Sequence, residues 1–75
     1  MMIERSVYPN RIRVVLAEQQ LTNRWLADKL GVTEITVSRW VTNKNQPSMA
    51  QFIKISKLLK VELTALLEKY DVDTE

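Results

Sequence analysis

A single glycine, Gly31, separates two short segments that both have the residue spacing of an α-helix. It is the only glycine among 75 residues, and glycine readily adopts the left-handed conformation in which many helices end. Before it, Leu26 and Leu30 are four residues apart, and after it, Val37 and Trp40 are three apart. The sequence therefore predicts two short helices that meet at a steep angle across a turn of three or four residues, which is helix-turn-helix spacing.

Each of these helices is preceded by a threonine that can cap it. Thr22 is expected to cap a helix that ends at Leu30, and Thr33 a helix that reaches about Val41. A threonine hydroxyl in this position accepts a hydrogen bond from an N–H group of the first turn. Once Val37 and Trp40 face the core, helical geometry turns residues 34–36, 38 and 39 outward.

The rest of the sequence also favours helices, because no run longer than about four residues alternates strictly between apolar and polar side chains. We expect an all-α chain of five short helices. The first begins near Pro9 or Asn10 and ends around Gln19 or Gln20, the fourth covers 49–59, and the fifth covers roughly 62–70 with Leu63, Leu66, Leu67 and Tyr70 on one face.

A polar loop, 42–47, is expected between the third and fourth helices, with Asn43 in the left-handed conformation. Ser48 and Gln51 then have the spacing of a capping box, in which each side chain bonds the backbone N–H of the other residue.

Charge is distributed unevenly along the chain. Residues 1–60 contain ten Lys and Arg and four acidic residues, a net charge of +6, whereas residues 61–75 contain one Lys and five acidic residues, a net charge of −4. A basic body can attract a polyanion, and an acidic end should point away from one.

Composition also excludes several classes of function. The chain has no Cys and no His, so it lacks the commonest metal ligands and the commonest general base. One glycine cannot form a phosphate-cradling loop, and the acidic residues of 71–75 lack the glycine of a calcium loop. We expect no enzyme activity, metal or cofactor. Without a long apolar run or a secretion signal, we expect a cytoplasmic protein with no membrane partner.

Several short motifs occur together around the predicted turn: Leu21-Thr22, Leu26-Ala27, Lys29-Leu30-Gly31-Val32-Thr33, Val37-Ser38-Arg39-Trp40 and Pro47-Ser48. With these residues, the segment from about Asn10 to Leu67 resembles the Cro/repressor (XRE-type) helix-turn-helix family. The resemblance implies a five-helix, lambda-repressor-like fold, DNA binding through the third helix, symmetric dimers and regulation of transcription.

The resemblance places four residues of the third helix where relatives read DNA bases: Glu34, Ile35, Thr36 and Arg39. Arg39 can bond guanine O6 and N7 together, and Thr36 can contact a base or a methyl group. Ile35 either meets a thymine methyl group or packs on the turn. Glu34 either accepts from cytosine N4 or stabilises the positive end of the helix dipole.

Phosphate contacts position such a module and commonly come from helix N-termini, polar side chains and cations. By position, the candidates are Thr22, Asn23, Arg24, Thr33, Ser38, Thr42, Lys44 and Asn45. Each cation among them could instead be a solvated surface charge.

Two departures from the family pattern affect packing. Relatives often pair an arginine with a glutamate at the positions that Leu16 and Val41 occupy here, so an apolar contact is expected instead. The glycine that usually follows the fourth helix is Lys60, which tolerates left-handed geometry less well.

We divide the chain into an N-terminal arm (1–9), a helix-turn-helix domain (10–70) and an acidic tail (71–75). The expected partners are double-stranded DNA and a second copy of the chain, with no evident small-molecule effector. The alternative is a protein-interaction module of the same fold, of antitoxin or adaptor type, for which an outward Ile35 and an exposed Trp25 would also be suited.

Overall fold

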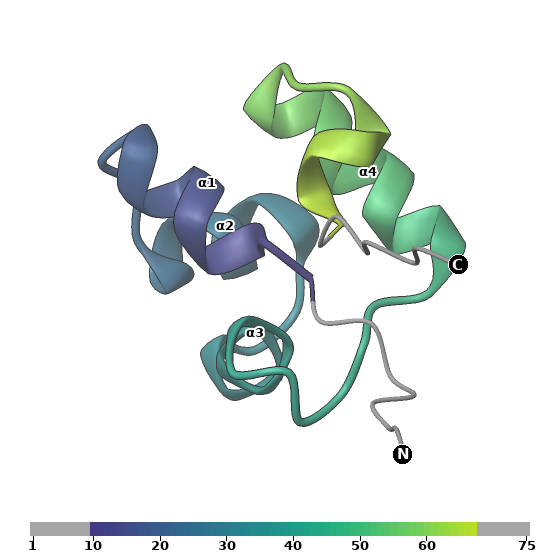
Figure 1. Cartoon of the computed structure of the whole chain (residues 1–75). Coiled ribbons are helices and arrows are strands. Elements are labelled where there is room, and N and C mark those ends of the chain that lie inside the picture. Colours follow the sequence, from purple (N-terminus) through teal and green to yellow (C-terminus); the bar gives the residue numbers. More distant parts are fainter. Residues whose placement is uncertain (1–9, 68–75) are drawn as a thin grey trace, which may run out of the picture.

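Four α-helices and a final 3₁₀-helix make up the computed structural model, which describes residues 10–67. They are α1 (Ile12–Glu18), α2 (Asn23–Leu30), α3 (Glu34–Val41), α4 (Met49–Leu59) and the 3₁₀-helix η1 (Leu63–Leu66). In Figure 1, α1 and α2 lie on one side of the molecule and α4 with η1 on the other. Helix α3 lies at the lower edge, away from the chain reversal that follows α4. The predicted all-α, lambda-repressor-like fold is confirmed.

The turn between α2 and α3 forms as the sequence predicts. Gly31 has φ 72° and ψ 29°, and its N–H donates to the carbonyl of Ala27 at 2.9 Å. The Thr22 hydroxyl accepts from the N–H of Trp25 at 3.0 Å, and the Thr33 hydroxyl accepts from the N–H of Thr36 at 3.1 Å. Both predicted caps are therefore confirmed, and they define where α2 and α3 begin.

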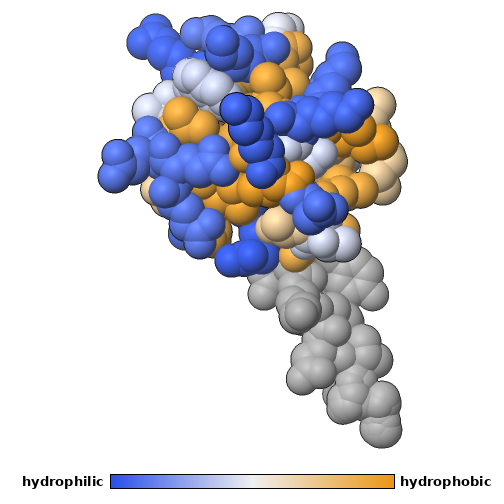
Figure 2. All heavy atoms as spheres, turned by 90° about the horizontal axis from the view of Figure 1, so that it is seen from above, coloured by the Kyte–Doolittle hydropathy of each residue, from blue (hydrophilic) through white to orange (hydrophobic). Residues whose placement is uncertain are grey.

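The core draws apolar side chains from every helix. Val37 is fully buried and Trp40 is 6% exposed, as the spacing in α3 predicts. Leu16 and Val41 are both buried in the same cluster, so apolar residues occupy the positions of the family's usual ion pair. Seen from above the view of Figure 1, hydrophilic side chains surround the hydrophobic atoms that reach the surface (Figure 2). The other core residues are Ile12, Val15, Leu26, Ala27, Phe52, Ile55, Leu59 and Leu66.

The prediction of an α-helix from 62 to 70 is wrong in its described part, because the chain forms only the short η1. Leu67 is extended, with φ −107° and ψ 141°, and forms an isolated antiparallel bridge with Asn10. The N–H of Arg11 donates to the carbonyl of Leu66 at 2.7 Å, so pairing with the segment before α1 replaces another helical turn. Leu66 is buried but Leu67 is 38% exposed, and Tyr70 lies outside the described residues.

The start of α1 and the cap of α4 differ in part from expectation, whereas α4 covers the predicted residues 49–59. Helix α1 begins at Ile12 rather than near Pro9 or Asn10. At α4, the Ser48 hydroxyl accepts from the N–H of Gln51 at 3.1 Å, but the buried Oε1 of Gln51 has no hydrogen-bond partner in the described part of the chain. Only one half of the predicted capping box therefore forms.

Besides Gly31, three residues that follow helices have left-handed backbone, and one of them was predicted. Asn43 has φ 61°, which confirms the expectation for the loop after α3. Lys60 adopts φ 59° after α4 despite its side chain, as the position usually held by glycine requires. Gln20 has φ 59° after α1, which the sequence did not indicate.

Candidate nucleic-acid interface

The outward face of α3 is exposed in the described part of the chain. Glu34, Ile35, Ser38 and Arg39 are exposed, whereas Thr36 is partly buried. Figure 1 shows α3 at the edge of the molecule. The buried Val37 and Trp40 anchor the opposite face of the helix, so the geometry needed for entry into a major groove is present.

The four base-reading candidates are not equivalent in the structure. Ile35 is 69% exposed, which argues against the alternative that it packs on the turn. Arg39 lies in the last turn of α3 and Glu34 in the first turn, where a carboxylate also stabilises the helix dipole. The Thr36 hydroxyl lies 3.0 Å from the Thr33 hydroxyl, so it takes part in the cap and has less freedom to meet a base.

The phosphate candidates gather at three places on the fold. Thr22, Asn23 and Arg24 lie at the start of α2, Thr33 and Ser38 belong to the α3 segment, and Thr42, Lys44 and Asn45 follow α3. All are exposed except Asn23, which is partly buried.

Thr42 is poorly placed to donate to a phosphate. Its hydroxyl donates to the carbonyl of Ser38 at 2.8 Å, so its only side-chain hydrogen is already used. The Lys44 ammonium group, by contrast, has three hydrogens that it can donate to a phosphate.

The loop after α3 is folded back onto the end of that helix. The N–H groups of Lys44 and Asn45 donate to the carbonyl of Arg39 at 2.9 and 3.3 Å. Because these amides are occupied, an approaching phosphate would meet the two side chains rather than the backbone. The loop also keeps Lys44 near the end of the outward face that carries Arg39.

A buried polar network, which sequence reasoning missed, joins the start of the described chain to the end of α3. Asn10 is only 6% exposed, and its Nδ2 donates to the carbonyl of Trp40 at 2.8 Å and to Oε1 of Gln46 at 2.9 Å. Its backbone N–H donates to Oδ1 of Asn43 at 2.7 Å, and its own Oδ1 accepts from the N–H of Ile12 at 3.0 Å. The network therefore fixes the position of the loop that carries the phosphate candidates.

Trp25 is partly buried, rather than exposed as the interaction-module alternative would favour. It packs against the core cluster, and the Lys29 ammonium lies 5.8 Å from the centre of its ring. A cation at this distance is attracted to the face of the ring. The aromatic surface at this position is therefore partly covered by α2 itself.

Residues 10–67 contain no group of three or more Asp, Glu, His or Cys side chains that could hold a metal ion. None of their helices has both the length and the apolar character needed to cross a bilayer.

Comparison with known proteins gives the family of the chain. The helix-turn-helix family matches residues 12–66, and the chain belongs to this family, of XRE type. It is also similar to a solved structure described as a "putative DNA-binding protein from Bacteroides fragilis", with 50% sequence identity and a TM-score of 0.81. The alignment covers 83% of this chain and 100% of that one. No curated protein matches the chain.

Proposed function

We propose that this protein is a sequence-specific DNA-binding regulator of transcription that acts in the cytoplasm, at the nucleoid, as a homodimer. The observation that carries the proposal is the outward face of α3, on which Ile35 is 69% exposed while Val37 on the other side is fully buried. Membership of the helix-turn-helix family and the likeness to the Bacteroides fragilis protein support it.

In this proposal, α3 enters the major groove and reads bases. Arg39 bonds the two acceptors of a guanine, and Ile35 contacts the methyl group of a thymine. Glu34 accepts from a cytosine amino group, and Thr36 contributes through its methyl group, because its hydroxyl is engaged with Thr33. An exposed isoleucine is unfavourable in water, so a thymine methyl group accounts for its presence at this position.

Phosphates are bound at both sides of α3. The exposed N-terminus of α2 brings Thr22, Asn23 and Arg24 to one strand, and the loop after α3 brings Lys44 and Asn45 to the other. The N-terminal amides of a helix and its positive dipole end both favour an anion. Residues 10–67 carry nine Lys and Arg and four acidic residues, a net charge of +5 that favours approach to DNA.

The homodimer is proposed from the symmetry that helix-turn-helix proteins share with their operators. Two copies related by a two-fold axis would place their α3 helices in successive major grooves, about 34–36 Å apart. Met49 and Ile53, one turn apart on α4, are 61% and 41% exposed and supply apolar surface that a second copy could cover.

The experiment that tests the proposal is selection of bound fragments from random DNA. We expect a motif with two-fold symmetry whose half-sites are centred about one helical turn apart. Enrichment of a single half-site would contradict the homodimer, and no enrichment of any sequence would contradict base reading by α3.

A protein-interaction module of the same fold is the second candidate, because an exposed isoleucine can also anchor a protein partner. Salt dependence of binding to the selected DNA distinguishes the two. For a DNA-binding protein, the logarithm of the affinity falls linearly with the logarithm of the salt concentration. Absence of a DNA complex even at low salt would favour the interaction module.

A further inference from the structure

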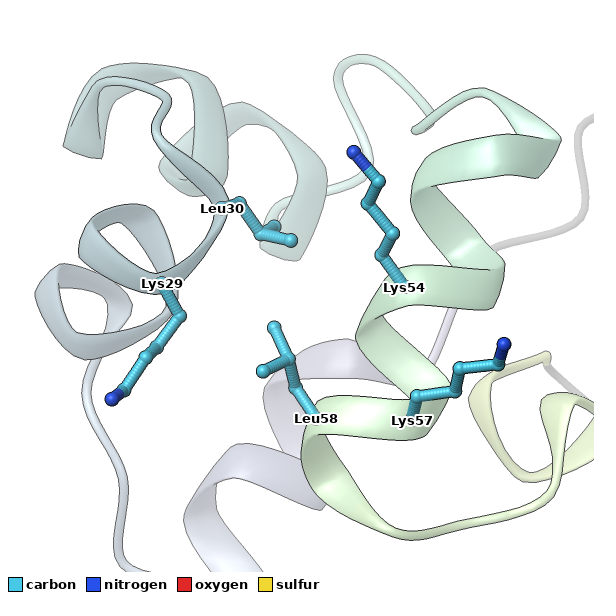
Figure 3. Close-up of a pocket in the computed structure, with 5 residues that line it drawn as sticks. All are labelled: Lys29, Leu30, Lys54, Lys57 and Leu58. Atoms are coloured by element: carbon cyan, nitrogen blue, oxygen red, sulfur yellow. The ribbon is translucent and has the colours of Figure 1, made fainter.

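A groove lies between the end of α2 and the second half of α4. Its volume is about 350 Å³, and it is lined by Lys29, Leu30, Lys54, Lys57 and Leu58. Leu30 and Leu58 project into the space between the two helices (Figure 3), and both are partly buried. The floor of the groove is therefore apolar, and of a size that accommodates one or two large side chains.

The rim of the groove is positively charged. Lys29, Lys54 and Lys57 are all exposed, and no acidic residue among 10–67 lines the groove. Their ammonium groups lie on different sides of the two leucines rather than converging on one point (Figure 3). This arrangement matches a molecule whose negative charges are spread around an apolar centre, rather than one with a single anionic head group.

We propose that this groove binds an acidic amphipathic peptide segment of a partner protein. One or two apolar side chains of the segment enter between Leu30 and Leu58, and carboxylates on either side of them pair with the three lysines. The charge complementarity speeds encounter and sets orientation, while the leucines provide the area removed from water.

The position of the groove separates it from the proposed DNA contacts. Lys29 is in the last turn of α2, six residues beyond Asn23, which corresponds to about 9 Å along the helix axis. Lys54 and Lys57 belong to α4, which carries none of the DNA-contact candidates. The groove therefore goes beyond the proposed function and can be tested without DNA.

The test is titration of the full-length, ¹⁵N-labelled protein with a synthetic peptide, Glu-Asp-Leu-Leu-Asp-Glu with blocked ends, followed by NMR. We expect saturable shifts of the amide signals of Leu30 and Leu58 and of the indole N–H of Trp25, whose ring lies beneath the Lys29 ammonium. Two matched peptides, Gln-Asn-Leu-Leu-Asn-Gln and Glu-Asp-Ser-Ser-Asp-Glu, each lack one of the two required properties. The uncharged peptide should bind at least about fivefold more weakly, the factor that one charge pair at 4 Å is worth in water. The serine peptide should bind at least about tenfold more weakly, because it loses the burial of its leucines. Equal binding of either peptide, or shifts located elsewhere, would overturn the proposal.

Variants of the lysines give an independent readout. Lys54→Gln and Lys57→Gln should each weaken peptide binding about fivefold, whereas Arg13→Gln, which removes an exposed charge on α1 away from the groove, should have a smaller effect. The double variant K54Q/K57Q should bind DNA with an unchanged salt dependence. If its salt slope falls by about 2 instead, the two lysines contact phosphates and the groove is part of the DNA interface. Failure of DNA binding in the unaltered protein would affect the proposed function alone.

Discussion

Replacement of Asn10 by alanine should destabilise the fold more than any substitution of an exposed polar residue. The Asn10 side chain donates to the carbonyl of Trp40 and to Oε1 of Gln46, and accepts from the N–H of Ile12. Alanine removes all three hydrogen bonds. The loss of stability depends on how many of the three partner groups are then buried without any other hydrogen bond.

The partners differ in this respect. The Trp40 carbonyl retains a hydrogen bond from the N–H of Asn43 at 3.0 Å, and Gln46 is only partly buried, so water can reach its side chain. The N–H of Ile12 belongs to a fully buried residue and loses its acceptor. A buried unsatisfied group costs about 1–3 kcal/mol, and each lost hydrogen bond about 0.5–1.5 kcal/mol. With one buried N–H left unsatisfied and two other hydrogen bonds lost, Asn10→Ala should therefore lower the free energy of unfolding by about 2–6 kcal/mol.

That loss is a large fraction of the stability of a domain of this size, which is about 4–11 kcal/mol at 0.05–0.15 kcal/mol per residue. The measurement is urea denaturation followed by circular dichroism, together with a thermal scan in which Tm should fall by at least about 8 °C. Asn45→Ala is the matched control, because Asn45 is exposed and should change stability by less than about 0.5 kcal/mol. A loss below about 1 kcal/mol for Asn10→Ala would refute the reasoning that the network is structurally required.

Three further predictions concern single side chains. Lys60→Gly should stabilise the protein by about 0.5–1 kcal/mol in urea denaturation, because Lys60 has φ 59° and glycine adopts this conformation without the side-chain penalty; a loss of stability would show that the lysine side chain makes a compensating contact. Arg39→Ala should weaken binding to the selected DNA by about 1–3 kcal/mol and relax base preference at one position. Equal weakening on every sequence would instead identify Arg39 as a phosphate contact. Lys44→Ala should weaken binding to all sequences alike and reduce the salt slope by about 1, and an unchanged slope would place Lys44 outside the interface.

The parts of the fold that the sequence predicts are those decided within a few residues. The caps at Thr22 and Thr33 and the left-handed turns at Gly31 and Asn43 depend on hydrogen bonds and backbone preferences of adjacent residues. Burial of Val37 follows from helical spacing in the same way. These features are enough to define the helix-turn-helix unit and the outward face of α3.

The parts that the sequence did not predict depend on residues far apart in the chain. Asn10 was expected only at the start of a helix, but its backbone N–H and its Nδ2 donate to Asn43 and Trp40, which lie 33 and 30 residues away in the sequence. The pairing of Arg11 with Leu66, which brings together the segments before α1 and after η1, shortened the predicted fifth helix to η1. The three lysines of the groove come from two helices about 25 residues apart, so no local motif marks them.

The contacts that hold α3 explain why its outward residues can be devoted to recognition. Thr33 satisfies the start of the helix, Val37 and Trp40 bury its inner face, and Asn10 bonds the Trp40 carbonyl near its end. Each of these residues lies on the inner side or at an end of the helix, and none of them is proposed to read bases. Thr36, which is proposed to do so, takes part in positioning the helix only because it shares the cap with Thr33. Because the helix is positioned without Ile35 and Arg39, changes at these two positions can alter which DNA sequence is bound while stability stays nearly constant.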